Sequence, residues 1–248
     1  MKKIILANLL SIFTLSFALG QSPEPKQNRV YRPDIPGSFK IDFGFNVAVN
    51  RPPETDFQTS FFPTNSLNLY YQYPFRFGKS NFSVNPGIGV SFERFKFTNG
   101  VIIVRQPNNR YEFEQASAQT QFSNDIKKTI LSARYVDMPL EFRFDTKPED
   151  LAHSFNFALG GRIGYLIDAM NKVKYVKTYS ANDSEKITNK DKQNLGLTKF
   201  RYGVYTRFGI GAFNLFFFYN LSPTFQPGIG PERTEMNTFT TGISINGF

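Results

Sequence analysis

The chain has 248 residues, a formal net charge of +9, 29 phenylalanines, and neither cysteine nor tryptophan. Its mean hydropathy of −0.33 excludes a long helical membrane core in the mature chain. The lack of cysteine excludes a lipoprotein anchor and disulfide bonds.

The first residues have the pattern of a secretory signal. Two lysines precede an apolar run, and the small residues around Gly20 suit a signal peptidase. We therefore expect a cleavable signal peptide over residues 1–20, and a single membrane anchor is the alternative. Residues 21–37 carry four prolines and predict an extended periplasmic arm, which could instead plug a lumen or bind a partner.

Beyond this arm, apolar residues alternate with small or polar ones at a period of two, the spacing of a strand with two unlike faces. The alternation is longest in residues 153–168, where Phe155 and Phe157 alternate with Asn156 and Ala158. A tilted strand of about 9–11 residues is enough to cross a membrane. The expected strands are 38–50, 66–77, 82–97, 130–145, 153–168, 199–208, 212–222 and 236–248.

Three local features interrupt this pattern. Pro74 lacks an N–H and predicts a strand end or a bulge. The apolar phase changes at residues 93–94, because Phe95 and Phe97 are odd-numbered whereas the apolar residues before them are even-numbered. A bulge or emergence from the membrane would explain that change. Residues 209–211, Gly-Ile-Gly, predict a tight turn.

The connections between the expected strands alternate between long and short. Eight strands with both ends in the periplasm place the short turns inside and the long loops outside, as in outer-membrane barrels. Within the second long connection, residues 101–104 and 111–113 flank Pro107 and predict a hairpin outside the membrane. The long connections are 50–65, 98–129, 169–198 and 223–235.

The apolar faces carry almost no charge, whereas the opposite faces carry most of the charged residues, Asp168 among them. A soluble barrel of lipocalin type, the main alternative, would be apolar inside and polar outside. The sequence thus predicts an all-β fold, an eight-stranded antiparallel up-and-down transmembrane β-barrel over residues 38–248. We expect the inward charges to form a structural ion-pair network in the lumen. Its expected members are Asp42, Arg76, Glu93, Asp137, Glu141, Arg143, Arg162, Arg201 and Arg207.

Few residues offer chemistry. The only histidine, His153, stands at the periplasmic start of a strand and is interpreted as a turn residue. Asp137 and Glu141 share one strand face with inward arginines nearby, which favours ion pairing over catalysis. We expect no enzyme activity, no cofactor and no metal site. Because an eight-stranded barrel is about filled by its own side chains, we expect no general diffusion pore.

The basic surplus is concentrated in residues 169–198, which contain Lys172, Lys190 and four further lysines. No motif for nucleic acid accompanies these lysines, so we expect no nucleic-acid partner. Contact with outer-membrane lipid, in particular with lipopolysaccharide phosphates, is one interpretation. A solvated loop is the other.

Short motifs occur at residues 20–21 (the signal end), 85–90, 135–140, 159–165, 207–211 and at Phe248. With these motifs the chain resembles the Bacteroidetes outer-membrane β-barrel family sometimes called PorT-like. The resemblance implies an outer-membrane location and, in a few members, a role in type IX protein secretion. It also implies that Phe248 is the assembly signal recognised by the barrel-assembly machinery, although Phe248 is out of phase with the outward Ile243 and Ile245 unless Gly247 is a bulge.

Together these observations favour a non-enzymatic, monomeric outer-membrane barrel. It would act as a binding or accessory subunit of a secretion or surface complex, through its external loops or its periplasmic arm. Two alternatives from other classes stay open, namely an outer-membrane enzyme that modifies lipid or cleaves protein, and a small-solute channel.

Overall fold

The computed structural model describes residues 37–50, 58–60, 64–120, 122, 125–180, 183–231 and 235–247. The expected signal peptide, almost all of the expected arm at 21–37 and the expected assembly signal Phe248 lie outside the described residues. Among the described residues, no helix has the length and apolarity needed to cross a membrane.

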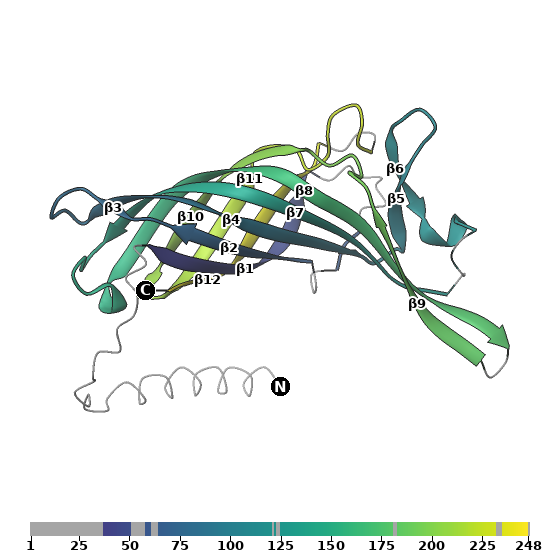
Figure 1. The fold of residues 1–248 in the computed structure, drawn as a ribbon, viewed down its shortest axis with the longest axis horizontal. Coiled ribbons are helices and arrows are strands. Elements are labelled where there is room, and N and C mark those ends of the chain that lie inside the picture. Colours follow the sequence, from purple (N-terminus) through teal and green to yellow (C-terminus); the bar gives the residue numbers. More distant parts are fainter. Residues whose placement is uncertain are drawn as a thin grey trace. The chain divides into compact units, whose positions relative to one another are not determined.

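In the described part of the chain, eight strands pair side by side and close into a ring (Figure 1). Each strand pairs antiparallel with its neighbour along the chain, and the last strand returns to pair with the first. The predicted eight-stranded up-and-down barrel is therefore confirmed. The ring strands are β1 (Ser38–Val49), β2 (Asn65–Gln72), β4 (Phe82–Phe97), β7 (Asp125–Asp145), β8 (Phe155–Ser180), β10 (Phe200–Ile210), β11 (Phe213–Asn220) and β12 (Asn237–Asn246).

Short elements accompany the ring. The prediction at Pro74 is confirmed, because β2 ends at Gln72 and pairing with β4 resumes only in β3. The expected turn at 209–211 is shifted, since β10 continues to Ile210 and the turn falls at Gly211, whose φ is +60°. These elements are β3 (Phe75–Arg76), β5 (Val101–Arg105), β6 (Tyr111–Gln115), β9 (Asp183–Lys192) and the 3-10 helices η1 (Ala116–Ala118) and η2 (Leu151–His153).

The two faces of the ring differ as the alternation predicts. On β8, the side chains of Phe157, Leu159 and Ile163 are 45%, 58% and 50% exposed on the outside. Ala158 and Arg162, which alternate with them, are buried on the inside. The outward apolar side chains form an apolar belt that suits lipid, while the inside holds polar and charged groups.

The expected change of apolar phase at residues 93–94 is confirmed, but no bulge causes it. From Ser91 to Phe97 the burial pattern of β4 alternates without a break, and Phe95 and Phe97 point inward and are buried. The phase changes because the lining of the barrel changes: toward the end with the long connections, the inward side chains are apolar rather than charged. The apolar cluster there includes Phe95, Phe97, Val101, Ile103, Tyr111, Leu131, Tyr135, Leu195, Leu197, Phe225 and Met236.

On β8, by contrast, a bulge changes the phase of the strand. The register of β7 with β8 shifts between Arg134 and Tyr135, so that Ile167 is the extra residue of a bulge. Beyond the bulge the even-numbered residues of β8 face outward. Asp168, which was expected in the lumen, therefore lies outside and pairs with Arg134 at 3.5 Å.

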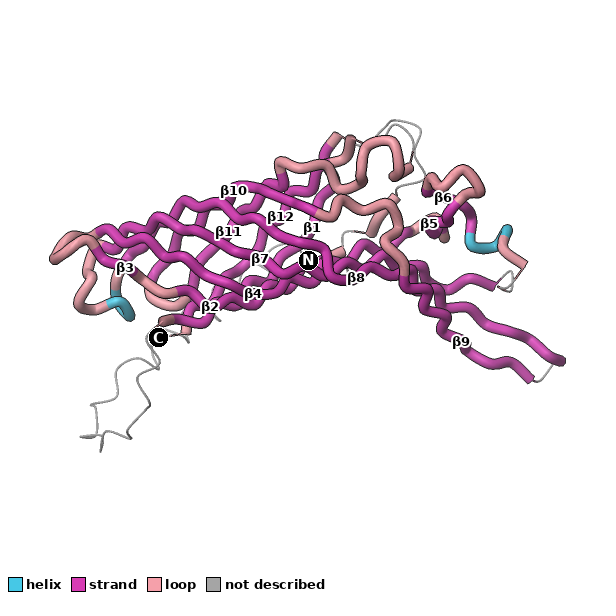
Figure 2. Tube along the Cα trace, turned by 45° about the horizontal axis from the view of Figure 1, so that its top comes forward, coloured by secondary structure: helices cyan, strands magenta, loops and turns pink. Residues whose placement is uncertain are grey.

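The connection at 169–198 is largely not a loop, in contrast to the expectation. Past Leu166, β8 leaves β10, continues to Ser180 and pairs with β9 in a hairpin beyond the ring (Figure 2). Val173 and Tyr175 pack there against Ile102 and Phe122. The hairpin expected within 98–129 is confirmed as the β5–β6 pair, which forms a separate two-stranded sheet.

The belt predicts the effect of a charge placed in it. Leu140→Arg, in the middle of the lipid-facing stretch of β7, should lower the free energy of unfolding by about 2–4 kcal/mol. Phe213→Arg, directly after the turn at Gly211, is the matched control at the edge of the belt and should cost about 0–1 kcal/mol. Urea unfolding in phospholipid vesicles, followed by circular dichroism, measures both. Equal losses would contradict the position of the belt.

Candidate functional site

The first group of charges in the lumen surrounds Arg201. Its Nε donates to Asp137 Oδ1 at 3.1 Å, its Nη2 donates to Asp137 Oδ2 at 2.7 Å, and its Nη1 donates to Glu93. Arg162 Nη1 lies 3.7 Å from Asp137 Oδ2 and donates to the Tyr70 hydroxyl, which itself donates to Asp137. Residues from β2, β4, β7, β8 and β10 thus meet in one cluster.

A second group lies around Arg207. Its Nη2 donates to Asp42 Oδ2 at 2.7 Å, and its Nη1 donates to Glu141. Lys40 Nζ donates to Glu141 Oε1 at 2.5 Å, and Asn85 donates to the same oxygen. The predicted network omitted Lys40, although its position in the inward phase of β1 marks it as a lumen residue.

The remaining two predicted members behave differently. Arg143 pairs with Asp145, two residues along its own strand, with Nε 2.9 Å from Oδ1. The expected network therefore missed Asp145 as well. Arg76 in β3 is exposed, and no ion pair joins it to a carboxylate among the described residues. The structure thus gathers seven of the nine predicted members in two groups, while Arg143 forms a separate pair with Asp145 and Arg76 joins neither group.

Each of the three central arginines also stacks on an aromatic ring. The guanidinium carbon of Arg162 lies 3.5 Å from the ring centre of Phe218, and that of Arg201 lies 3.7 Å from that of Tyr135. Arg207 lies 4.3 Å from the ring centre of Tyr205. Such cation–π contacts add to the ion pairs and fix the guanidinium planes across the lumen.

The buried charges of the lumen balance. Among the described residues, five basic and five acidic side chains are buried, so that each burial cost is offset by a partner. The space between Arg162, Arg207, Tyr70 and Phe216 is too small to hold a water molecule. The lumen at this level is therefore filled by its own side chains. The buried charges are Lys40, Arg143, Arg162, Arg201, Arg207, Asp42, Glu93, Asp137, Glu141 and Asp145.

The candidate catalytic residues all have ion-pair partners. His153 lies in η2 with Nδ1 2.9 Å from Asp150, and both side chains are largely exposed. Asp137 and Glu141 are each held by two basic side chains. Within the described ranges, no group of three histidine, aspartate or glutamate side chains is arranged to hold a metal.

The end of the ring with the long connections is closed by the β5–β6 hairpin. Val101, Ile103 and Tyr111 pack into the apolar cluster around Phe95. Asn171 of β8 binds both main-chain groups of Ile103 in β5, because its Oδ1 accepts from Ile103 N and its Nδ2 donates to Ile103 O at 2.6 Å. The hairpin is thus an ordered part of this end.

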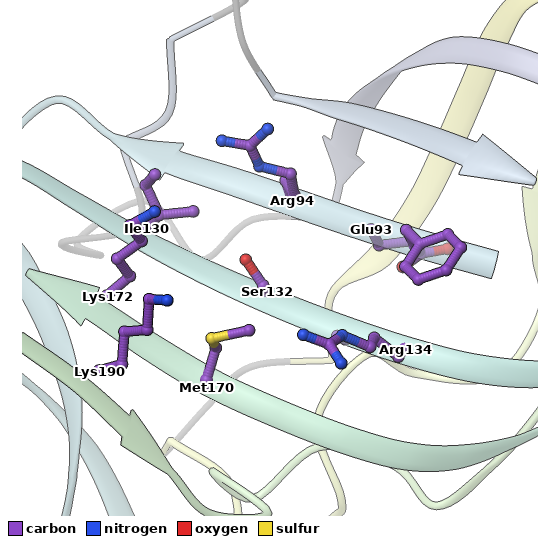
Figure 3. Close-up of a pocket in the computed structure, with 10 residues that line it drawn as sticks. Glu93, Arg94, Ile130, Ser132, Arg134, Met170, Lys172 and Lys190 are labelled. Atoms are coloured by element: carbon purple, nitrogen blue, oxygen red, sulfur yellow. The ribbon is translucent and has the colours of Figure 1, made fainter.

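A surface rich in cations lies on the outside of the same end, beyond the bulge. It spans β4, β7, β8 and β9 and surrounds a shallow pocket of about 270 Å³. Figure 3 shows Ser132 between Arg94 and Met170, with Lys172 and Lys190 to one side. We call this surface the basic face. Its members are Arg94, Lys96, Lys128, Lys172, Lys174, Lys190 and Lys192.

A closed antiparallel ring, apolar outside and ionic inside, is the architecture of a membrane-spanning β-barrel. The chain belongs to the outer membrane protein beta-barrel domain family, whose model matches residues 24–242. It is therefore an outer-membrane β-barrel protein.

Two solved structures are similar at low identity. One is Ail, the attachment invasion locus protein of Yersinia pestis, in complex with the heparin analogue sucrose octasulfate. It has 13% identity and a TM-score of 0.34, and the match covers 85% of this chain and 97% of Ail. The other is Neisserial surface protein A, with 9% identity, a TM-score of 0.33, and coverage of 85% and 95%. No curated protein matches the chain.

The lumen network predicts a stability difference between two arginines. Arg201→Met leaves Glu93 and Asp137 buried with fewer partners and should cost about 3–5 kcal/mol. Arg134→Met removes an equal charge from the partly exposed pair with Asp168 and should cost about 0–1 kcal/mol. Unfolding is followed by circular dichroism, because the chain has no tryptophan. Similar losses for the two variants would contradict the network.

Proposed function

We propose that the protein is a non-enzymatic binding or accessory subunit of the outer membrane, acting through the end that carries the long connections. The filled lumen carries this proposal, because it leaves the two ends of the ring as the places where a partner can bind. Porin-level conductance in planar bilayers would contradict the closed lumen.

The long-connection end suits protein binding. The β5–β6 and β8–β9 hairpins are ordered by their own apolar contacts and extend beyond the ring (Figure 2). In the part of the chain that the structure describes, β9 pairs only with β8, so its other edge is available to an extended segment of a partner. Strand addition to such an edge supplies main-chain hydrogen bonds.

The asymmetry of the connections supports an orientation with the hairpins outside the cell and both termini in the periplasm. The short turns at Gly78, Asp150 and Gly211 share the end at which β1 begins and β12 ends. The PorT-like resemblance implies a first partner to seek, a subunit of a type IX secretion complex.

The orientation is tested with single cysteines, which the natural chain lacks. We expect a membrane-impermeant maleimide to label Asn108→Cys, at the tip of the β5–β6 hairpin, on intact cells. Lys79→Cys, in a short turn at the other end, should be labelled only after the cells are lysed. If only Lys79→Cys were labelled on intact cells, the orientation would be the opposite of the proposed one.

The binding role is tested by affinity purification from detergent-solubilised outer membranes. We expect a stoichiometric partner with the full chain, and its loss when residues 177–186 at the tip of the β8–β9 hairpin are replaced by a two-residue turn. A variant without residues 22–36 is the control and should keep the partner. Loss in the control alone would assign binding to the arm, and no partner in any sample would contradict the proposal.

A further inference from the structure

The members of the basic face lie on neighbouring rungs of one sheet. Lys96 is level with Ile130, which pairs with Lys172, and Lys172 pairs with Lys190. The next rung toward the belt runs from Arg94 through Ser132 and Met170 to Lys192, and the rung on the other side holds Lys128 and Lys174. The register therefore gathers seven cations on a single outward surface.

These cations have no ion-pair partner in the part of the chain that the structure describes. Among the described residues, no ion pair joins any member of the basic face to a carboxylate, whereas Arg134 just below is paired with Asp168. Burial, together with repulsion from neighbouring cations such as Arg94, lowers the pKa of both Lys128 and Lys172. Repulsion of this kind is relieved when an anion binds between the charges.

The basic face lies directly above the apolar belt. Arg94 is two residues beyond Phe92 on β4, and Lys172 is five residues beyond the exposed Ile167 on β8. On the other side of the ring, outward positions near the same end are apolar and exposed, as at Val47 of β1 and Leu221 just past β11. The cations thus face sideways, at the level of lipid headgroups and on one side only, which solubility alone would not require.

The pocket within the basic face combines cationic side chains with a hydroxyl. Ser132 offers a hydroxyl at its centre, between the longer side chains of Arg94 and Met170, and Lys172 and Lys190 border it (Figure 3). A guanidinium and ammonium groups around a hydroxyl donor match the oxygens of a phosphate group.

We propose that this pocket binds a phosphate group of lipopolysaccharide, the phosphorylated glycolipid of the outer leaflet. The basic face then anchors one side of the barrel to that leaflet and sets its tilt and rotation in the membrane. This inference goes beyond the proposed partner binding, and it can fail or succeed with purified protein and lipid alone.

The test uses the mature protein in micelles of a zwitterionic detergent and labelled bisphosphorylated lipid A as the probe, with fluorescence anisotropy as the readout. We expect the Arg94→Gln/Lys172→Gln variant to bind about thirtyfold more weakly than the natural protein, from the loss of two cations near the headgroups. The control, Lys79→Gln/Lys147→Gln, removes the same charge at the opposite end and should bind as the natural protein does. If circular dichroism shows that the Arg94→Gln/Lys172→Gln variant misfolds, the Lys96→Gln/Lys190→Gln variant is used in its place.

Three competitors distinguish the source of the phosphate. Dephosphorylated lipid A, phosphatidylglycerol and inorganic phosphate should each displace the probe far less well than bisphosphorylated lipid A does. Equal displacement by dephosphorylated lipid A would overturn the role of phosphate, and equal displacement by either of the others would overturn the choice of glycolipid. Equal weakening in the control variant would show non-specific attraction and would likewise overturn the proposal.

Discussion

Hydrocarbon offers no partner to a backbone N–H or C=O, so a sheet that enters a membrane must close on itself. Here the closing pair is β1 with β12, held in register from Lys40 opposite Asn246 to Val49 opposite Asn237. Closure with eight strands fixes a narrow interior. The filled lumen and the balanced buried charges follow from that single constraint, and so does our proposal that binding uses the ends.

The narrow interior brings opposite charges from facing strands within reach of each other, so that the buried ionic groups are paired. Each central arginine meets two acidic side chains and the face of an aromatic ring, as Arg201 meets Glu93, Asp137 and Tyr135. Burying an ion pair gives little net stability, but removing one partner is costly. The network therefore specifies a unique packing of the lumen, and above it the interior can change to the apolar cluster around Phe95.

Strand number and polarity could be predicted because a period of two is readable within a single strand, as at Phe155 and Phe157. Features that depend on neighbouring strands could not. The bulge at Ile167 carries no mark in the sequence, so the alternation alone predicts Asp168 inside. The pair of Arg143 with Asp145, by contrast, joins two residues on one face of the same strand, so its spacing was readable in the sequence. The lysines of the β8–β9 hairpin make its sequence resemble a polar loop. Val173 and Tyr175 nevertheless show the same alternation of apolar and polar residues in weaker form.

The outward placement of the apolar residues is tested most directly by spin labels at single cysteines along residues 155–163 of β8 in lipid vesicles. Oxygen concentrates in hydrocarbon, so we expect frequent collisions with oxygen at the odd-numbered positions and few at the even-numbered ones. Loss of the alternation, or the opposite phase with the odd-numbered positions shielded from lipid, would contradict a barrel that is apolar outside and ionic inside.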